Sequence, residues 1–271
     1  MMKDVAFGQY YPTKSYVHNL DPRLKIVFLI AYIVAIFLAK NFYGLACCFL
    51  VLAFAIGFSR VPVLRVFKAI KGILFLIVFT TLLNLLFYNG ETVYAEWWIF
   101  TITKEGILFS VFLVIRLVLL ITCSSLLTYT TTPVALTDGI ESLLFPLTLI
   151  RFPVRELAQI MSIALRYIPI LIDETERIMN AQKARGANFE SGGLVSRVKA
   201  VIPVLIPLLL SSFRRAEELG DAMEARCYTG GRKRTKYKKL RFTWRDLLAF
   251  LAGAALITGV VLLNVYLGVT I

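Results

Sequence analysis

The chain has 271 residues, of which 58% are hydrophobic, and it carries a formal net charge of +13 at pH 7. Soluble domains are usually nearer about 45–50% apolar. The composition therefore excludes an ordinary soluble globular protein and indicates a polytopic membrane protein with a sizeable basic part. The four cysteines have no metal-ligand spacing and suggest no disulfide framework. Polar and aromatic residues begin the chain, so we expect no cleavable signal peptide.

The first predicted element is a membrane helix at 24–39. Asp21 followed by Pro22 is typical of a helix start, with Asp21 as the N-cap and Pro22 at the first helical position. Arg23 would then anchor this end of the helix at the lipid headgroups. A second span is predicted at 43–59, after a connection that allows only a tight turn. Both spans are at the short end of what crosses a bilayer.

The next segments set the predicted orientation. Residues 60–72 mix lysines and arginines with apolar residues, which predicts a basic amphipathic segment at the membrane surface. A third span follows at 73–88. The loop at 89–105 is net acidic and contains two tryptophans, so we expect it outside, and a fourth span at 106–129 returns to the cytoplasm. The amino terminus is then cytoplasmic and the carboxyl terminus extracellular.

Arg116 lies near the middle of the fourth predicted span. An arginine inside the membrane is a functional hypothesis by default, but it can also snorkel or pair within the bundle and fix packing. We favour the second interpretation, and we expect Asp21 and Arg23 to have structural roles as well.

Residues 130–242 do not read as an ordinary membrane bundle. We predict three helices here, opened by Thr132 as N-cap before Pro133, and then one last membrane helix. The apolar stretch at 201–210 is too short to span a bilayer, so we expect it at the membrane boundary or against an apolar protein. A basic cluster at 229–241 would bind anionic lipid. The predicted domains are 1–129 with four spans, 130–242 with helices at 133–149, 154–186 and 194–228, and 243–271 with the last span.

Two stretches of the middle region share one pattern. Laid over each other, 174–186 and 215–227 match Glu176 with Glu217, Ala181 with Ala222, Ala184 with Ala225 and Arg185 with Arg226, and a small residue follows each arginine, Gly186 or Cys227. On a helix, residues three and four apart share a face. Each stretch therefore forms a smooth patch that ends in one long cation, a shape that can enter a groove and bind carboxylates or carbonyls there. One copy alone would be an ordinary helix end; the matching pair favours a function.

The sequence lacks the motifs of an enzyme. The string from Gly8 to Ser15 departs from the nucleotide-binding loop pattern, because Thr13 stands where its second glycine belongs. No metal-ligand cluster is present, and the single histidine, His18, argues against a serine-hydrolase triad in the membrane. We therefore expect no chemistry from this chain, and another protein must supply any ATP site.

Several strings together resemble the transmembrane T component of energy-coupling factor (ECF) transporters, known as the EcfT family. They are Asp21-Pro22-Arg23-x-Lys25, Thr131-Thr132-Pro133, Leu165-Arg166-Tyr167-Ile168-Pro169, Ala184-Arg185-Gly186 and Ala225-Arg226-Cys227. The resemblance covers essentially the whole chain. Cys227 departs from the glycine of the family's second motif, but it is also a small residue.

This resemblance implies an all-α polytopic membrane protein with about five transmembrane helices and a cytoplasmic coupling domain of three helices. It implies a scaffold in a prokaryotic cell membrane that joins two ATPases to a small membrane S component, which captures vitamins or other micronutrients. Arg185 would enter a groove on one ATPase and Arg226 a groove on the other, and Glu176, Ala181, Glu217 and Ala222 would support them. The partner ATPases would bind ATP and Mg, and this chain would bind no cofactor and no nucleic acid. The expected S-component contacts are Pro203, Leu205, Pro207 and Leu208.

Two other interpretations remain open. A conventional ABC permease would form its own substrate path, and direct substrate binding by the isolated protein would favour it. An intramembrane enzyme would have to show activity without any ATPase. The two tandem Ala-Arg ends favour the scaffold over both.

Overall fold

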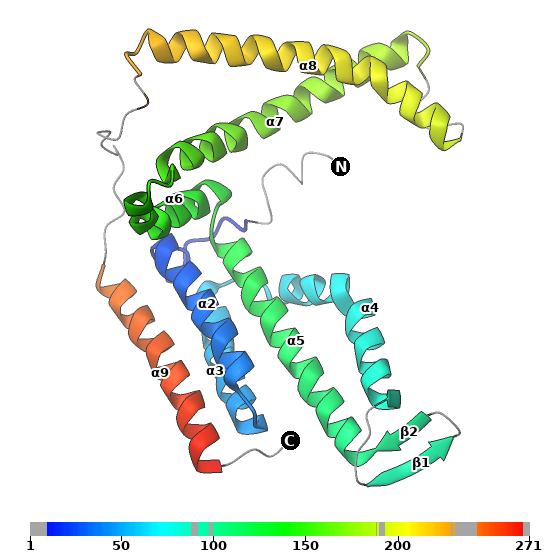
Figure 1. Cartoon of the computed structure of the whole chain (residues 1–271), viewed down its shortest axis with the longest axis vertical. Helices are drawn as coiled ribbons and strands as arrows, with labels where there is room; N and C mark the ends of the chain where they lie inside the picture. The colour runs from blue at the N-terminus through cyan, green and yellow to red at the C-terminus, as the bar shows by residue number, and fades with distance from the viewer. Residues whose placement is uncertain are drawn as a thin grey trace. The chain divides into compact units, whose positions relative to one another are not determined.

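The computed structural model describes residues 10–87, 92–97, 100–187, 189, 193–228, 230 and 243–267. Its helices confirm the prediction of an all-α polytopic membrane protein (Figure 1). The described residues form two compact units, 10–143 with 243–267 and 144–228. The first unit contains α2 (Pro22–Leu38), α3 (Phe42–Ser59), α4 (Val63–Phe87), α5 (Lys104–Thr130), α6 (Pro133–Leu144) and α9 (Trp244–Leu267).

Five helical segments of the described chain are long and apolar enough to cross a membrane: Phe42–Ser59, Val63–Phe87, Lys104–Thr130, Pro133–Ile150 and Asp246–Tyr266. The predicted number is right, but the membership differs. The first predicted span corresponds to α2, which has 17 residues and is therefore at the short limit for a span. Pro133–Ile150, predicted to be cytoplasmic, qualifies by length and composition, although it is the least hydrophobic of the five.

Two predicted segments contain more regular structure than expected. The surface segment at 60–72 and the third span form one helix, α4, which bends along its length in Figure 1. The loop at 89–105 contains an antiparallel hairpin of β1 (Val93–Trp97) and β2 (Phe100–Thr103). Its alternating β-branched and aromatic residues favour strands.

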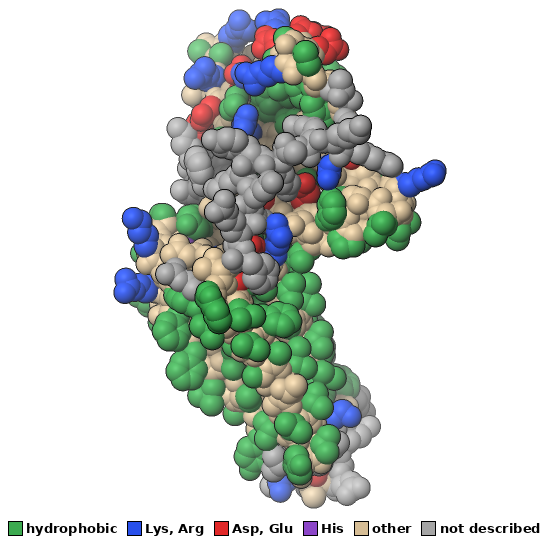
Figure 2. All heavy atoms as spheres, turned by 90° about the vertical axis from the view of Figure 1, so that its left-hand side faces the viewer, with side chains coloured by type: hydrophobic (Ala, Val, Ile, Leu, Met, Phe, Trp, Pro, Cys, Tyr) green, Lys and Arg blue, Asp and Glu red, His purple; other side chains and the backbone are tan. Residues whose placement is uncertain are grey.

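The core of the first unit lies among α2, α3, α5 and α9. Its buried side chains include Tyr32, Ile36, Leu45, Leu119 and Val260. Outward-facing side chains are also apolar: hydrophobic groups cover most of the visible face of this unit in Figure 2. Such a surface is expected where lipid rather than water solvates the helices.

Polar groups join the start of α2 to the neighbouring helices. Asp21 caps α2 as predicted, because its carboxylate accepts from Arg23 N, with Pro22 in the first turn. The Asp21 N–H donates to buried Asp246 at 2.9 Å, and Thr243 N donates to the other oxygen of Asp246 at 2.8 Å. The Lys25 ammonium donates to the carbonyls of His18 and Thr130 and to Thr131 Oγ1.

The opposite end of α2 has its own polar partners. Arg116 donates to the Ala39 carbonyl at 2.8 Å, and its guanidinium lies 4.7 Å from the ring centre of Phe112. Asn264 of α9 donates to Leu38 O at 2.6 Å and accepts from Lys40 N at 3.2 Å. The last carbonyls of a helix lack partners within it, so Arg116 and Asn264 satisfy backbone groups that lipid could not.

The segment before α2 is tied down by His18. Its imidazole contacts the hydroxyls of Thr13 and Ser15 and the Tyr11 carbonyl, at 3.3, 2.7 and 3.0 Å. The Tyr11 N–H in turn donates to Tyr129 O of α5 at 2.9 Å. Burial is the main cause that lowers the pKa of His18 below its ordinary value, so the neutral ring is favoured here.

Candidate functional site

The second unit contains a short 3-10 helix (Phe145–Ile150) and two helices of 31 residues each, α7 (Val154–Ala184) and α8 (Leu194–Glu224). The two Ala-Arg stretches lie at the C-terminal ends of α7 and α8. Arg185 is the C-cap of α7, and Arg226 lies in the turn that closes α8.

The two ends have the same backbone geometry. After Arg185, Gly186 N donates to Lys183 O and Ala187 N donates to Gln182 O, both at 3.0 Å. After Arg226, Cys227 N donates to Glu224 O at 2.8 Å and Tyr228 N to Met223 O at 3.0 Å. This pair of bonds defines a Schellman motif, which requires a left-handed residue after the helix. Gly186 and Cys227 supply it, with φ of 89° and 55°.

The surface of each end is uncovered by the rest of the described chain. The exposed residues are Ala181, Ala184, Arg185 and Gly186 at one end and Ala222, Ala225, Arg226 and Cys227 at the other. Of the supporting carboxylates, Glu217 is exposed and Glu176 is half-buried. Each arginine therefore projects from a small-residue surface, which the contact hypothesis requires.

The helices α7 and α8 cross in an antiparallel arrangement (Figure 1). Gln159 near the start of α7 contacts Met223 near the end of α8, and Gln182 near the end of α7 contacts the Pro203 carbonyl. Between these contacts, Arg215 and Glu174 form an ion pair at 3.1 Å. The two arginine-bearing ends consequently point to opposite ends of the helix pair.

The ion pair marks an approximate two-fold relation between the helices. In the alignment of the two stretches, Glu174 matches Arg215 and Gln182 matches Met223. Arg185 follows Glu174 by eleven residues, and Arg226 follows Arg215 by the same number. At about 1.5 Å per residue, each arginine lies roughly 16 Å along its helix from the crossing. Two equivalent ends are thus presented symmetrically about one point.

Sequence reasoning missed the residues that hold this arrangement. Tyr228 Oη donates to Gln159 Oε1 at 2.8 Å, and Gln159 Nε2 lies 3.7 Å from Met223 Sδ, so Gln159 fixes the Arg226 end against α7. The opposite charges of Glu174 and Arg215 at matched positions were a usable signal, because two-fold pairing brings matched positions together. Gln159 carries no comparable sequence signal.

The predicted S-component contacts lie on α8, which continues through both of its prolines. Pro203, Leu205 and Pro207 are exposed, and Leu208 is half-buried. Nearby exposed apolar side chains extend this surface, namely Ile206, Leu209, Leu210 and Phe213. The basic cluster predicted at 229–241 lies almost entirely outside the described residues. No group of three or more metal-ligating side chains occurs among the residues that the structure describes.

Comparison with known proteins identifies the family. Residues 13–237 match the CbiQ family, described as cobalt transport protein. An energy-coupling factor transporter transmembrane protein EcfT from Ruminiclostridium cellulolyticum is 47% identical over 97% of this chain and 98% of its own length. The proteins of the same name from Brevibacillus brevis and Clostridium kluyveri are 49% and 44% identical, over 91% and 99% of this chain and 93% and 100% of their own lengths.

The chain belongs to this family. The predicted resemblance to EcfT is confirmed, and the chain is a multi-pass membrane component of an energy-coupling factor transporter, a complex with other subunits.

Proposed function

We propose that this EcfT chain couples two cytoplasmic ATPases to a small membrane S component, with Arg185 docked in a groove on one ATPase and Arg226 in a groove on the other. The ATPases bind ATP and Mg, and this chain catalyses nothing and binds no cofactor. Movement of the ATPases passes along α7 and α8 to the S component, which releases its vitamin or other micronutrient into the cell.

One observation carries this proposal: two helix ends with the same Schellman geometry lie at equal distances from the Glu174–Arg215 pair. Equivalent surfaces suit equivalent partners. The alanines permit close approach of a groove wall, and the arginine fork can bind carboxylates or backbone carbonyls at its base. A pair of similar ATPases related by two-fold symmetry matches this arrangement.

The remaining parts of the proposal concern the membrane. The exposed apolar face of α8 around Leu205 and Pro207 suits an apolar partner such as the S component. The domain that contains α7 and α8 would face the cytoplasm, with the amino terminus on the same side and the carboxyl terminus outside. Basic residues in the first turns of α4, such as Arg65 and Lys68, support this orientation by the positive-inside rule.

The test is co-purification of the two ATPases with variants of this chain. Arg185→Ala and Arg226→Ala should each weaken one interface by about 2–5 kcal/mol, because each leaves a partner group buried without its cation. The double variant should lose both ATPases and uptake, yet still insert into the membrane. Arg177→Ala and Arg214→Ala are matched controls, since both arginines are exposed on the same helices.

The proposal fails if the double variant retains both ATPases and full uptake. It fails equally if the control variants lose the ATPases to the same extent, because the loss would then reflect total charge rather than the helix ends.

A further inference from the structure

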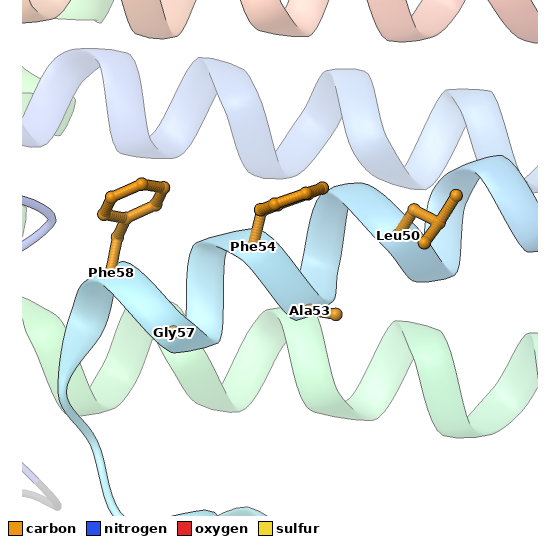
Figure 3. A pocket seen from close by; sticks show the side chains of 5 residues that line it. All are labelled: Leu50, Ala53, Phe54, Gly57 and Phe58. Carbon is orange, nitrogen blue, oxygen red and sulfur yellow. The ribbon is translucent and has the colours of Figure 1, made fainter.

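Two hollows lie side by side in the membrane unit. A cavity of about 340 Å³ is lined by parts of α2, α3, α5, α9 and the segment before α2. A shallow, open groove of about 400 Å³ lies on α3 and is lined by five residues of this helix, Leu50, Ala53, Phe54, Gly57 and Phe58. Phe54 and Phe58 line both hollows. Figure 3 shows these two rings projecting from α3 one turn apart, while Ala53 and Gly57 leave the neighbouring surface low.

Both hollows suit hydrocarbon. Nearly every side chain that lines them is apolar, and Phe54 and Phe58 are 66% and 62% exposed. A side chain added at Gly57 would meet nothing within 4 Å. Lys25 and Thr130 are polar members of the cavity lining, and Tyr16 adds a hydroxyl. The Lys25 ammonium already donates to three oxygens, and the Thr130 hydroxyl donates to the Leu126 carbonyl. The deep part of the site therefore offers nothing to a polar ligand.

Two exposed cations are close in sequence to residues that line the cavity. Tyr16 and Phe58 form part of the lining, and their ring centres are 6.4 Å apart. Lys14 lies two residues before Tyr16, and Arg60 lies two residues after Phe58. Both cations are exposed. The lining residues come from the first turns of α2 and α9 and the last turns of α3 and α5, which places the cavity at the end of the bundle where headgroups begin.

We propose that these hollows bind one anionic phospholipid, which straddles the ridge of Phe54 and Phe58. One acyl chain occupies the cavity, the other lies in the groove over Gly57, and the phosphate pairs with Arg60 and Lys14. Two adjoining apolar hollows, with exposed cations close in sequence to their lining, match the two tails and single headgroup of such a lipid. Each exposed cation near the membrane surface contributes to the preference for a negatively charged headgroup.

The test uses the full chain, reconstituted in bilayers of phosphatidylcholine with a minor share of phosphatidylglycerol and then released for native mass spectrometry. The wild-type chain should retain one phosphatidylglycerol. Gly57→Leu and Ala252→Leu should abolish this retention by filling the groove and the cavity rim. Arg60→Gln should weaken it about five-fold, and Arg60→Lys should preserve it.

Matched controls separate this effect from general damage. Gly259→Leu places the same side chain in open space on another membrane helix, and Lys104→Gln removes an exposed cation far along the sequence from the site. Both should retain the lipid. The proposal is overturned if the two lipids are retained equally, if Gly259→Leu acts like Gly57→Leu, or if Gly57→Leu leaves the bound lipid in place.

Discussion

At the scale of single residues, Gly186 and Cys227 occupy the same left-handed position at two helix ends, yet only one of them is a glycine. A residue with a Cβ loses about 1–2 kcal/mol in this conformation. Nothing lies within 4 Å of a side chain built at Gly186, so the cost of Gly186→Ala comes from the backbone alone. We expect this variant to open the end of α7 more often, and Cys227→Gly to tighten the end of α8.

Hydrogen exchange measures both effects. The amides of Ala187 and Tyr228, which close the two Schellman motifs, should exchange about 5–30 times faster in Gly186→Ala and more slowly in Cys227→Gly. An unchanged Ala187 rate in Gly186→Ala would contradict the assignment of strain to this position.

The contacts of Arg116 indicate a structural role. Its bond to the Ala39 carbonyl satisfies the end of α2, so Arg116→Met should leave that carbonyl unpaired and lower the free energy of unfolding by about 1–3 kcal/mol. Thermal unfolding of the detergent-solubilised chain measures this change, with Lys104→Met on the same helix as the control. Normal stability combined with lost uptake would instead make Arg116 a functional residue.

At the scale of elements, the Glu174–Arg215 pair sets how α7 crosses α8. Both side chains are about one-third exposed, so the pair adds little stability, about 1 kcal/mol at most. Its effect should appear in geometry instead. Arg215→Glu opposes two carboxylates at the crossing and should broaden the range of crossing angles, whereas the double variant Glu174→Arg with Arg215→Glu should restore it.

Spin labels at residues 180 and 221 report this angle. Both positions are exposed and match each other in the alignment of the two stretches, and a Cys227→Ser background removes the exposed native thiol. The distance distribution should widen in the single reversal and narrow again in the double reversal. Equal distance distributions in all three proteins would show that the Glu174–Arg215 pair does not set the crossing angle.

Helices with strong local signals were predicted well. The cap at Asp21, the start at Pro133 and the ends of α7 and α8 each rest on residues that act within one turn. Features that depend on contacts between distant segments were not predictable. The contact of Gln159 with Tyr228 is of this kind. Asp246 was missed although the sequence contains a local signal for it: Thr243-x-x-Asp246 has the spacing of a capping box.

At the scale of the whole molecule, the proposed orientation makes Cys227 a useful probe. It is exposed, whereas Cys48 and Cys123 are buried and Cys47 is half-buried in α3. A membrane-impermeant maleimide should therefore label the chain in inside-out vesicles and not in intact cells, and bound ATPases should protect it. Cys227→Ser provides the background. Labelling from the outside of intact cells would reverse the proposed topology.

The sequence predicted only in part which helices belong to the membrane. Composition distinguishes the membrane helices from the long amphipathic helices α7 and α8. Length and hydropathy alone do not assign the short α2 or the apolar segment Pro133–Ile150. Whether a segment crosses the bilayer depends on its neighbours. Arg116 and Asn264 donate hydrogen bonds to the carbonyls at the C-terminal end of α2. These bonds allow so short a helix to end inside the membrane.

The closed backbone at the ends of α7 and α8 affects how a partner can bind. The carbonyls at both helix ends already accept hydrogen bonds within their own turns. A partner that binds these ends therefore does not need to fold them. Little conformational entropy is then lost on assembly. Under the proposed function, recognition is left to the arginine and the alanines, and each helix end can leave its ATPase and bind again without unfolding.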